Sequence, residues 1–402
     1  MMHGPRERTS SCDSSQRATR AVVDLGAIRH NVCLVRAAVG PGVRLMAMVK
    51  ANAYGHGAVP VARACVEAGA TGLAVAAVDE GLALRRSGIT APLLVLGASA
   101  PEEHPEALRH DLTLAVGSLR MADNVAAAAR ATGVTARVHV EVDTGMSRFG
   151  VPAARAVEEI SALAVLPGLE LEGIYTHFAA AEEPDRRSAR AQLALFTGLL
   201  EALAARDVRV PLRHAANSAA ILELPEAHLD LVRPGIALYG YHPAGADPRG
   251  LRPALTLSSV LVRVEAMPAD TGVSYNHTFR TTRPSVLGLV PLGFADGLPR
   301  LLSNRGHMLV RGRRCPIVGR VCMDQTVLDV TDVPGARVGE PVVVLGCQGA
   351  ERIGADEIGL HAGTNAYETL CRIGPRVPRD YCGRLSPHNS VGCYGRRLRT
   401  IE

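Results

Sequence analysis

Eight short apolar runs alternate with longer amphipathic stretches between Met46 and Ala237, and this rhythm limits the possible folds more than any other feature of the chain. The runs, which we expect to form strands, are Met46–Lys50, Gly72–Val75, Leu93–Leu96, Leu112–Ala115, Arg137–Val142, Leu171–His177, Leu212–Ala215 and Leu231–Ala237. The helical patterns between them include Val59–Ala68, Asp79–Ser87, Met121–Ala131, Ala153–Leu163 and Ser188–Arg206. Such an alternation predicts a closed (β/α)8 TIM-type barrel with its active site at the carboxyl ends of the strands.

A different pattern follows the linker 241–250, where β-branched runs are separated by Gly, Pro and Asp. These runs, expected as strands, are Leu257–Val264, Val286–Pro291, His307–Val310, Thr326–Val330 and Val342–Leu345. The sequence therefore predicts an α/β chain with a barrel domain at 21–250 and a β-rich C-terminal domain at 251–383.

The formal net charge of +5 lies entirely in the two ends of the chain. Residues 1–20 carry four arginines against two acids, and residues 384–402 carry four arginines against one acid. The body is therefore formally neutral, which argues against a nucleic-acid partner. We expect 1–20 to be a disordered tail and 384–402 to be a basic tail.

Nine cysteines occur without any CxxC spacing, a usage that fits reduced thiols in the cytoplasm better than disulfides or a metal site. The N-terminus lacks an apolar signal region, and no segment offers the roughly 18 apolar residues of a membrane helix. These features predict a cytoplasmic protein without a membrane partner.

Lys50 is the first candidate for chemistry, because it ends the apolar run Met46-Ala-Met-Val-Lys50 and is followed by Ala-Asn-Ala-Tyr54-Gly-His-Gly57. Desolvation disfavours the ammonium form, so a lysine at this place can lose its proton and add to a carbonyl carbon. A lysine that merely extends its amine to solvent from a strand end would fit the same pattern. Spacing alone does not separate the two interpretations.

The segment Val49–Ala58 resembles the pyridoxal-phosphate (PLP) lysine motif of bacterial alanine racemases, and further matches follow in family order. They are Asp143–Arg148, Tyr175–Phe178, His214–Ser218, Arg233–Ile236, Val273–Tyr275, Gly293–Gly297, Gly319–Asp324 and Asn365–Glu368. Together these segments span roughly residues 22–382. The resemblance implies a PLP-dependent isomerase, and in this family the N-terminal strand, here Ala21–Asp24, can join the second domain.

By this resemblance one set of residues binds the cofactor. Its members are Lys50, Tyr54, His177, Ser218, Arg233, Gly235, Ile236 and Tyr367. Lys50 would bond the cofactor, and Arg233 would face the pyridine nitrogen, which stays unprotonated because a guanidinium donates no proton at working pH. His214 would support Arg233, although a structural histidine fits that position nearly as well. Taken alone, Arg233-Pro-Gly235 would pass for an ordinary turn.

Racemisation without moving the substrate requires a proton donor on each face of the reacting carbon. The resemblance assigns one face to Lys50 and the other to Tyr275 of a partner subunit, so the protein would be a homodimer with shared sites. His177 would hydrogen-bond that tyrosine, although a lone histidine on a strand is more often structural.

Arg148 and the backbone of Met323, with Asp324 in support, would hold the substrate carboxylate by the same resemblance. Many alanine racemases have a carbamylated lysine at the position of Glu141, and its carbamate orients the arginine that matches Arg148. We hypothesise that Glu141 supplies this negative charge directly. Its carboxylate would then lie within hydrogen-bond distance of Arg148, unless it pairs elsewhere.

The sequence thus predicts a two-base racemase of L- and D-alanine that supplies D-alanine for peptidoglycan. A racemase of broader or different specificity, for example for serine, is the alternative, because Phe294 stands where the family motif usually has tyrosine. A decarboxylase of similar architecture fits the Tyr275 motif less well. A PLP-carrying binding protein without turnover would lack the second domain, so the β-rich part favours an enzyme.

Overall fold

Contacts divide the chain into two compact units in the computed structural model, which describes residues 17–245 and 249–383. The barrel unit contains Val22–Thr256, Gly354–Ile373 and the described residues from Tyr381 onward. The β-rich unit contains Leu257–Ile353, Gly374–Asp380 and the described residues up to Ala21. Residues 354–373, which the sequence pattern assigned to the second domain, therefore group with the barrel.

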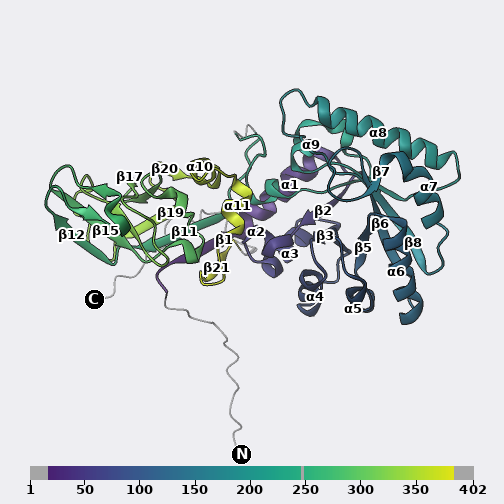
Figure 1. Ribbon diagram of the computed structural model, residues 1–402, viewed down its shortest axis with the longest axis horizontal. Helices are drawn as coiled ribbons and strands as arrows, with labels where there is room; N and C mark the ends of the chain where they lie inside the picture. The colour runs from purple at the N-terminus through teal and green to yellow at the C-terminus, as the bar shows by residue number, and fades with distance from the viewer. Residues whose placement is uncertain (1–16, 246–248, 384–402) are drawn as a thin grey trace, which may run out of the picture. The chain divides into compact units, whose positions relative to one another are not determined.

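Eight parallel strands form the barrel, in the order β10-β2-β3-β4-β5-β6-β8-β9 (Figure 1). Their bounds are β2 Arg44–Met48, β3 Gly72–Val75, β4 Leu93–Val95, β5 Thr113–Val116, β6 Ala136–Asp143, β8 Leu169–Tyr175, β9 Leu212–His214 and β10 Leu231–Val232; the short β7, Val151–Pro152, pairs with β6. The expected barrel is confirmed, and each predicted run overlaps a strand, although β10 ends at Val232 and the last run ends within a 3-10 helix at residues 236–239.

The barrel is nearly closed, because β9 and β10 stand at the two ends of the strand order. Two backbone hydrogen bonds connect the residues beside these strands, from Asp230 N to Arg213 O at 3.0 Å and from Arg233 N to Ala216 O at 2.9 Å. The Asp230 carboxylate also accepts from the backbone and the guanidinium of Arg213. This seam fixes the start of the segment that carries Arg233.

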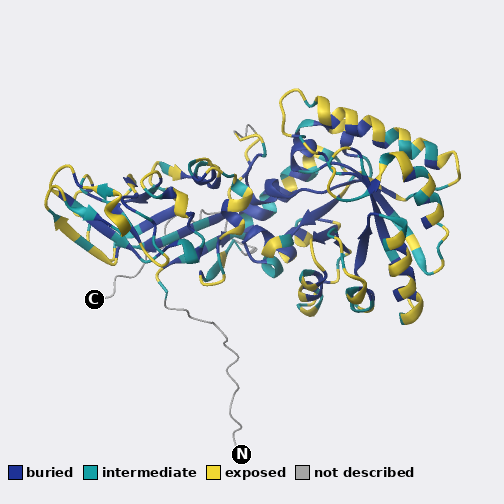
Figure 2. Ribbon diagram, in the orientation of Figure 1, coloured by how far each residue is buried: buried dark blue, intermediate teal, exposed yellow. Residues whose placement is uncertain are grey.

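Helices surround the strands, which are the most deeply buried part of the unit (Figure 2). Their bounds are α1 Leu25–Val39, α3 Ala58–Glu67, α4 Val78–Arg86, α5 His104–Arg109, α6 Leu119–Thr132, α7 Ala153–Leu163, α8 Arg187–Ala204, α9 Ser218–Glu223, α10 Ala355–His361 and α11 Ala366–Cys371. The apolar face of each long helix packs inward, as in α6, where Ala122, Val125 and Ala129 are buried. The five expected helices are all present.

The apolar run had suggested that strand β2 reaches Lys50, but it does not. The strand ends at Met48, and Lys50–Tyr54 (α2) form a single tight turn. Ala51, Asn52, Ala53 and Tyr54 all have φ between 51° and 53°, which is the left-handed region. L-residues adopt this region at a cost of roughly 1–2 kcal/mol each, so packing around the turn must hold it.

Three sheets lie wholly or mostly in the β-rich unit, and the largest has the order β17-β16-β19-β11-β1-β21 with β20 paired to β19. Its strands are β1 Arg20–Asp24, β11 Leu255–Val260, β16 His307–Val310, β17 Arg313–Pro316, β19 Pro341–Gln348, β20 Glu351–Ile353 and β21 Arg379–Cys382. The smaller sheets contain β12 Arg263–Met267, β15 Ser285–Val290 and β18 Thr326–Asp329, and β13 Gly272–Val273 with β14 Phe279–Arg280. The expected single strand Leu257–Val264 is wrong, because it breaks between β11 and β12, which belong to different sheets.

The N-terminal strand joins the large sheet beside β11, as the family resemblance implied. Residues 17–20 are ordered rather than part of a tail. Thr19 is fully buried, and its hydroxyl bonds Ser259 and the carbonyl of Pro291. Composition could not predict this order because both partners are far away in sequence. The remaining tail predictions, for 1–16 and 384–402, fall outside the described residues.

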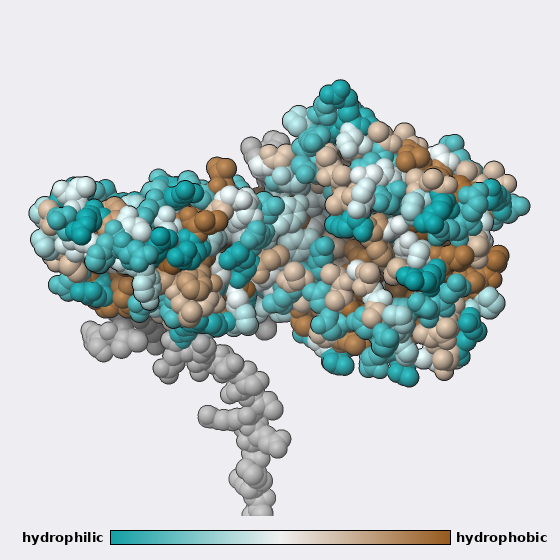
Figure 3. Space-filling model, in the orientation of Figure 1, coloured by the Kyte–Doolittle hydropathy of each residue, from teal (hydrophilic) through white to brown (hydrophobic). Residues whose placement is uncertain are grey.

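No helix in the described part of the chain is long and apolar enough to cross a membrane. On the face drawn in Figure 3, hydrophobic residues occur in small groups among hydrophilic ones.

Short 3-10 helices complete the fold: η1 Pro101–Glu103, η2 Pro225–Ala227, η3 Ile236–Tyr239, η4 Tyr275–His277, η5 Phe294–Asp296 and η6 Arg300–Leu302.

We expect Asp230→Ala to weaken the barrel seam and to lower the free energy of unfolding by about 1 kcal/mol at pH 7. The hydrogen bond from the Arg213 side chain lowers the pKa of Asp230, so the stabilisation is complete above about pH 3.9 and disappears as the pH falls through the folded-state pKa. Urea unfolding at several pH values tests this. Glu201→Ala, which removes an exposed carboxylate on α8, is the control, and an equal loss in both variants would contradict the role of the seam.

Candidate active site

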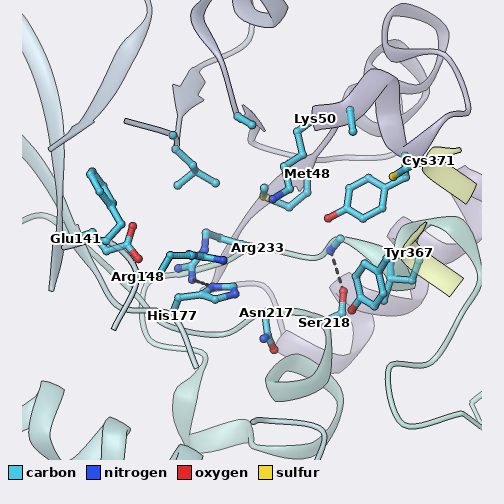
Figure 4. Close-up of a pocket in the computed structure, with 18 of the residues that line it drawn as sticks. Met48, Lys50, Glu141, Arg148, His177, Asn217, Ser218, Arg233, Tyr367 and Cys371 are labelled. Atoms are coloured by element: carbon cyan, nitrogen blue, oxygen red, sulfur yellow. Dashed lines mark hydrogen bonds between the residues drawn. The ribbon is translucent and has the colours of Figure 1, made fainter. Parts of the chain in front are cut away.

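A cavity of about 680 Å³ opens at the carboxyl ends of the barrel strands (Figure 4). Its walls come from residues at or just after the ends of β2, β3, β4, β6, β8, β9 and β10, with α11 on one side. The lining includes Lys50, Tyr54, Glu141, Arg148, Tyr175, His177, Ser218, Arg233, Gly235, Ile236, Tyr367 and Cys371. The sequence had singled out ten of these twelve as residues that bind the cofactor or the substrate or that support this binding; Tyr175 and Cys371 are the other two.

Lys50 points its amine into this cavity (Figure 4). Burial, and after it the positive charge of Arg148, lowers the pKa of the amine from its usual value, while Glu80 acts in the opposite direction. The Glu80 carboxylate also accepts the backbone N–H of Ala51 at 2.6 Å and that of Ala76 at 2.9 Å. It thereby ties the turn after Lys50 to the loop after β3.

The left-handed turn brings Tyr54 back under the same cavity. Its ring stacks on Tyr239 with centroids 4.7 Å apart, and the Tyr239 hydroxyl donates to the carbonyl of Met48 at 2.7 Å. A Cβ on Gly235 would lie 2.7 Å from the Tyr54 hydroxyl oxygen. Glycine is therefore required at 235 for the phenol and the backbone to share this space.

Ser218 faces the same corner from the start of α9. Its Oγ accepts the backbone N–H groups of Gly235 at 2.8 Å and of Ala237 at 3.3 Å, the first of which is dashed in Figure 4. Because the oxygen already accepts two hydrogen bonds, its own proton is left to donate to a ligand. The Ser218 and Tyr54 hydroxyls and the Ile236 backbone together form a small polar corner that suits an anion.

Arg233 is only 3% exposed, and it has no carboxylate partner within 4.0 Å among the described residues. Its guanidinium instead donates to neutral acceptors: Nδ1 of His214 at 2.7 Å and the carbonyls of Thr176 at 2.8 Å and Ala215 at 3.2 Å. It also lies over the Tyr175 ring, 5.0 Å from the centroid. These contacts fix the cation in one orientation.

A chain of hydrogen bonds leads from Arg233 through the barrel interior. His214 Nε2 lies 2.8 Å from His139 Nδ1, and His139 Nε2 lies 3.1 Å from a Glu172 carboxylate oxygen. Arg233 can only donate, so the proton of neutral His214 must be on Nε2, and that of His139 must also be on Nε2. Burial keeps both histidine pKa values below the usual range, so both rings stay neutral.

The pairing of β6 with β8 contains an irregularity that allows this chain of hydrogen bonds to form. Val138 of β6 pairs with Leu171, but His139 pairs with Gly173, so Glu172 is an extra residue on β8. Such a bulge turns the Glu172 side chain toward His139. A Cβ on Gly173 would lie 2.5 Å from the His139 ring, which explains the glycine.

His177 contacts Arg233 through Nδ1 at 3.3 Å. Burial first, then the charges of Arg233, Arg148 and Lys50, lower the pKa of His177 to about 3. The ring is therefore neutral at working pH, with Nδ1 as acceptor and Nε2–H as donor. The donor is available to a group that enters the cavity.

The hypothesis of a direct Glu141–Arg148 pair is wrong for this structure. Both side chains line the cavity, but among the described residues no hydrogen bond or ion pair within 4.0 Å joins them. Burial raises the pKa of Glu141, against the opposing effects of Tyr175 and Arg233. Arg148 instead sits on a loop fixed by Asp143, whose carboxylate accepts three backbone N–H groups from residues 145–147.

Tyr275 and Met323 belong to the β-rich unit, where they line a second cavity of about 630 Å³ with Asp324. Tyr275 is 69% exposed and Met323 is 55% exposed. The turn that presents Tyr275 has left-handed φ values at Ser274, Asn276 and His277. Backbone strain of this kind is often stored at functional sites.

The sequence reasoning missed Glu80, Glu172 and Cys371. With regular alternation along β8, the Glu172 side chain would point away from the barrel interior, and only the bulge turns it inward. Cys371 lines the cavity beside Tyr367, and burial raises the pKa of its thiol. A signal for Cys371 was its place four residues after Tyr367 on one helix. Within the described residues, no group of three His, Cys, Asp or Glu side chains could hold a metal ion.

We expect Glu172→Leu to lower the free energy of unfolding by about 1–3 kcal/mol, because it leaves the His139 Nε2–H without an acceptor. Glu172→Gln, whose amide oxygen can still accept, should lose less. Urea unfolding compares the two variants. Histidine ¹⁵N NMR of the wild type should find the protons of His139 and His214 on Nε2, and a proton on Nδ1 of either ring would contradict the assigned direction.

Comparison with known proteins places this site in a family. The model of the alanine racemase N-terminal domain matches residues 23–243, and that of the alanine racemase C-terminal domain matches residues 254–381. The alanine racemase of Desulfosudis oleivorans is 46% identical over 91% of this chain and 97% of its own length.

Solved structures agree with the sequence matches. The alanine racemase from the D-cycloserine producer Streptomyces lavendulae has a TM-score of 0.88 at 42% identity, covering 92% of this chain and 98% of that one. The alanine racemase from Bacillus anthracis with bound L-Ala-P has a TM-score of 0.85 at 39% identity, covering 92% of this chain and 96% of that one. The chain therefore belongs to the alanine racemase family.

Proposed function

We propose that this protein interconverts L- and D-alanine with pyridoxal 5′-phosphate as its cofactor, supplying D-alanine for peptidoglycan. One observation carries the proposal: a lysine of lowered pKa and a buried arginine held by neutral acceptors face the same cavity as a polar corner suited to an anion. Relatives that cover almost the whole chain are named alanine racemases, which supports the reaction and the substrate.

The cavity residues fit PLP. Lys50 is the amine that would bond the cofactor, and the Tyr54 and Ser218 hydroxyls with the backbone at Gly235-Ile236 would hold its phosphate. The close approach of Tyr54 to Gly235, which a Cβ would prevent, is the observation that favours a phosphate here. Tyr367 also borders the cavity, with its phenol pKa raised to about 12 by burial and then by Glu182, so it would donate rather than ionise.

When bound, PLP withdraws electrons from the bonds to the α-carbon of the amino acid attached to it. Arg233 limits this effect, because it offers N–H donors but no transferable proton to a ring nitrogen that faces it. The hydrogen-bond chain behind it, ending at Glu172, keeps the guanidinium from turning away. The result would be a brief carbanion and a proton returned to the same carbon.

The two faces of the α-carbon need separate proton carriers. Lys50 would serve one face and the partner's Tyr275 the other, which requires a homodimer. The large exposed fractions of Tyr275, Met323 and Leu301 in the β-rich unit support such an interface. The Nε2–H of His177 would donate to the tyrosine oxygen and favour its phenolate, since a free phenol with a pKa near about 10 is a weak base.

Arg148 would bind the substrate carboxylate, together with the backbone of the partner's Met323. The Arg148 side chain is exposed to the cavity and has no carboxylate within 4.0 Å in the described part of the chain. It is therefore available to an entering amino acid.

The direct test follows the optical rotation of L-alanine solutions with the purified, PLP-loaded protein, with serine assayed in parallel. We expect racemisation of alanine by the wild type and a loss of at least about a hundredfold in Tyr275→Phe. In D₂O the variant should still exchange the α-proton of one enantiomer, through Lys50. An inactive wild type would contradict the function, and a fully active Tyr275→Phe would contradict the two-base mechanism.

Shared sites are tested by hybrid dimers purified with two different tags. A Lys50→Ala subunit paired with a Tyr275→Phe subunit contains one site with both residues intact and one site with neither. We expect the hybrid to have about half the wild-type activity, whereas each parent homodimer has almost none. An inactive hybrid would mean that the two residues act within one chain.

A further inference from the structure

A charge cluster around the buried Asp296 in the β-rich unit joins the N-terminal segment to the loop that carries Met323. Asp296 has no exposed surface, and its Oδ1 accepts from Nη2 of Arg17 at 2.7 Å and lies 3.4 Å from Nε of Arg376. Nη2 of Arg376 also donates to Asp324 at 2.7 Å. We call Arg17, Asp296, Asp324 and Arg376 the Asp296 cluster.

The second oxygen of Asp296 holds the backbone beside the cluster. It accepts the N–H of Gly293 at 3.0 Å, at the start of the short helix η5. A buried carboxylate is unfavourable unless it is paired, so the two arginines and this N–H determine whether η5 keeps its place.

Helix η5 in turn holds residues 319–325, the Met323 loop. The N–H groups of Phe294 and Ala295 donate to the carbonyls of Cys322 and Met323, each at 3.0 Å. A Cβ on Gly293 would lie 2.3 Å from the Met323 carbonyl oxygen, so the two segments are in close contact. The loop is therefore fixed at its backbone by η5 and at Asp324 by Arg376.

Arg17 completes the cluster from a position just before the match to the N-terminal domain model, which begins at residue 23. It binds twice, to Asp296 through Nη2 and to the carbonyl of Arg376 through Nη1 at 2.7 Å. Its side chain is 25% exposed, so much of this contact is shielded from solvent. Arg17 thus pairs with the buried carboxylate beside Arg376. It also holds the backbone of Arg376, whose side chain donates to Asp324.

We propose that Arg17 is a positioning residue for substrate binding, which acts through the Asp296 cluster to hold the Met323 loop. The inference rests on the proposed function, in which the Met323 backbone contacts the carboxylate of the substrate bound by the partner. A looser loop weakens this contact but leaves the proton carriers Lys50 and Tyr275 in place. The effect therefore falls on substrate affinity more than on turnover.

The experiment compares Arg17→Ala with Arg20→Ala in the PLP-loaded full-length protein. Arg20 also forms an N-terminal ion pair, with Asp380 instead of Asp296, so it controls for general stability. We expect Arg17→Ala to raise the KM for L- and D-alanine about three- to tenfold with kcat changed less than about twofold. Arg20→Ala should leave KM unchanged, and Arg17→Lys should give an intermediate KM.

Hydrogen exchange measured by mass spectrometry gives a readout that does not depend on activity. Peptides that cover residues 319–325 should exchange faster in Arg17→Ala than in Arg20→Ala, while barrel peptides around Lys50 stay unchanged. Unchanged KM and unchanged loop exchange in Arg17→Ala, or equal increases in both variants, would overturn the inference. A wild type that fails to racemise alanine would instead overturn the proposed function. Hydrogen exchange does not require activity, so it would still show whether Arg17 holds the Met323 loop.

Discussion

The buried guanidinium of Arg233 is the interaction on which the rest of the site depends. A cation removed from water must be compensated, and here the compensation comes from two carbonyls, two histidine nitrogens and an aromatic face instead of a carboxylate. Because these partners are neutral, they do not cancel the positive charge, which still acts on its surroundings. It contributes to the lowered pKa values of Lys50 and His177.

Arg233 also determines where protons reside at a distance. Because it only donates, each neutral ring in the chain behind it has a single allowed tautomer, and the negative end of the chain is Glu172. Because Arg233 also donates to Nδ1 of His177, the Nε2–H of that ring is a donor toward the cavity. A site that must return protons to one carbon thus begins with its own protons in defined positions.

Much of the fold and many of the residues that line the cavity could be predicted from the sequence, because apolar periodicity and local motifs carry that information. Barrel strands, long helices, Lys50, Ser218 and Arg233 were found in this way. The features that were missed depend on contacts between distant segments. No local pattern indicates the break after Val260 or the order of residues 17–20. The Glu141 hypothesis failed for the same reason, since strand alternation gives the face of a residue but not its distance from a loop.

The extra residue at Glu172 has a consequence for how the barrel assembles. If β8 paired with β6 without the bulge, one stretch of the strand would be shifted by a residue, and every side chain on it would change faces. The Glu172 carboxylate would then move away from His139, and the His139 Nε2–H would lose its acceptor. A wrong alignment of these two strands would therefore lose the hydrogen bond between His139 and Glu172 and would also misplace apolar side chains. The same acid that orders the protons of the site thus also favours the correct alignment of the strands.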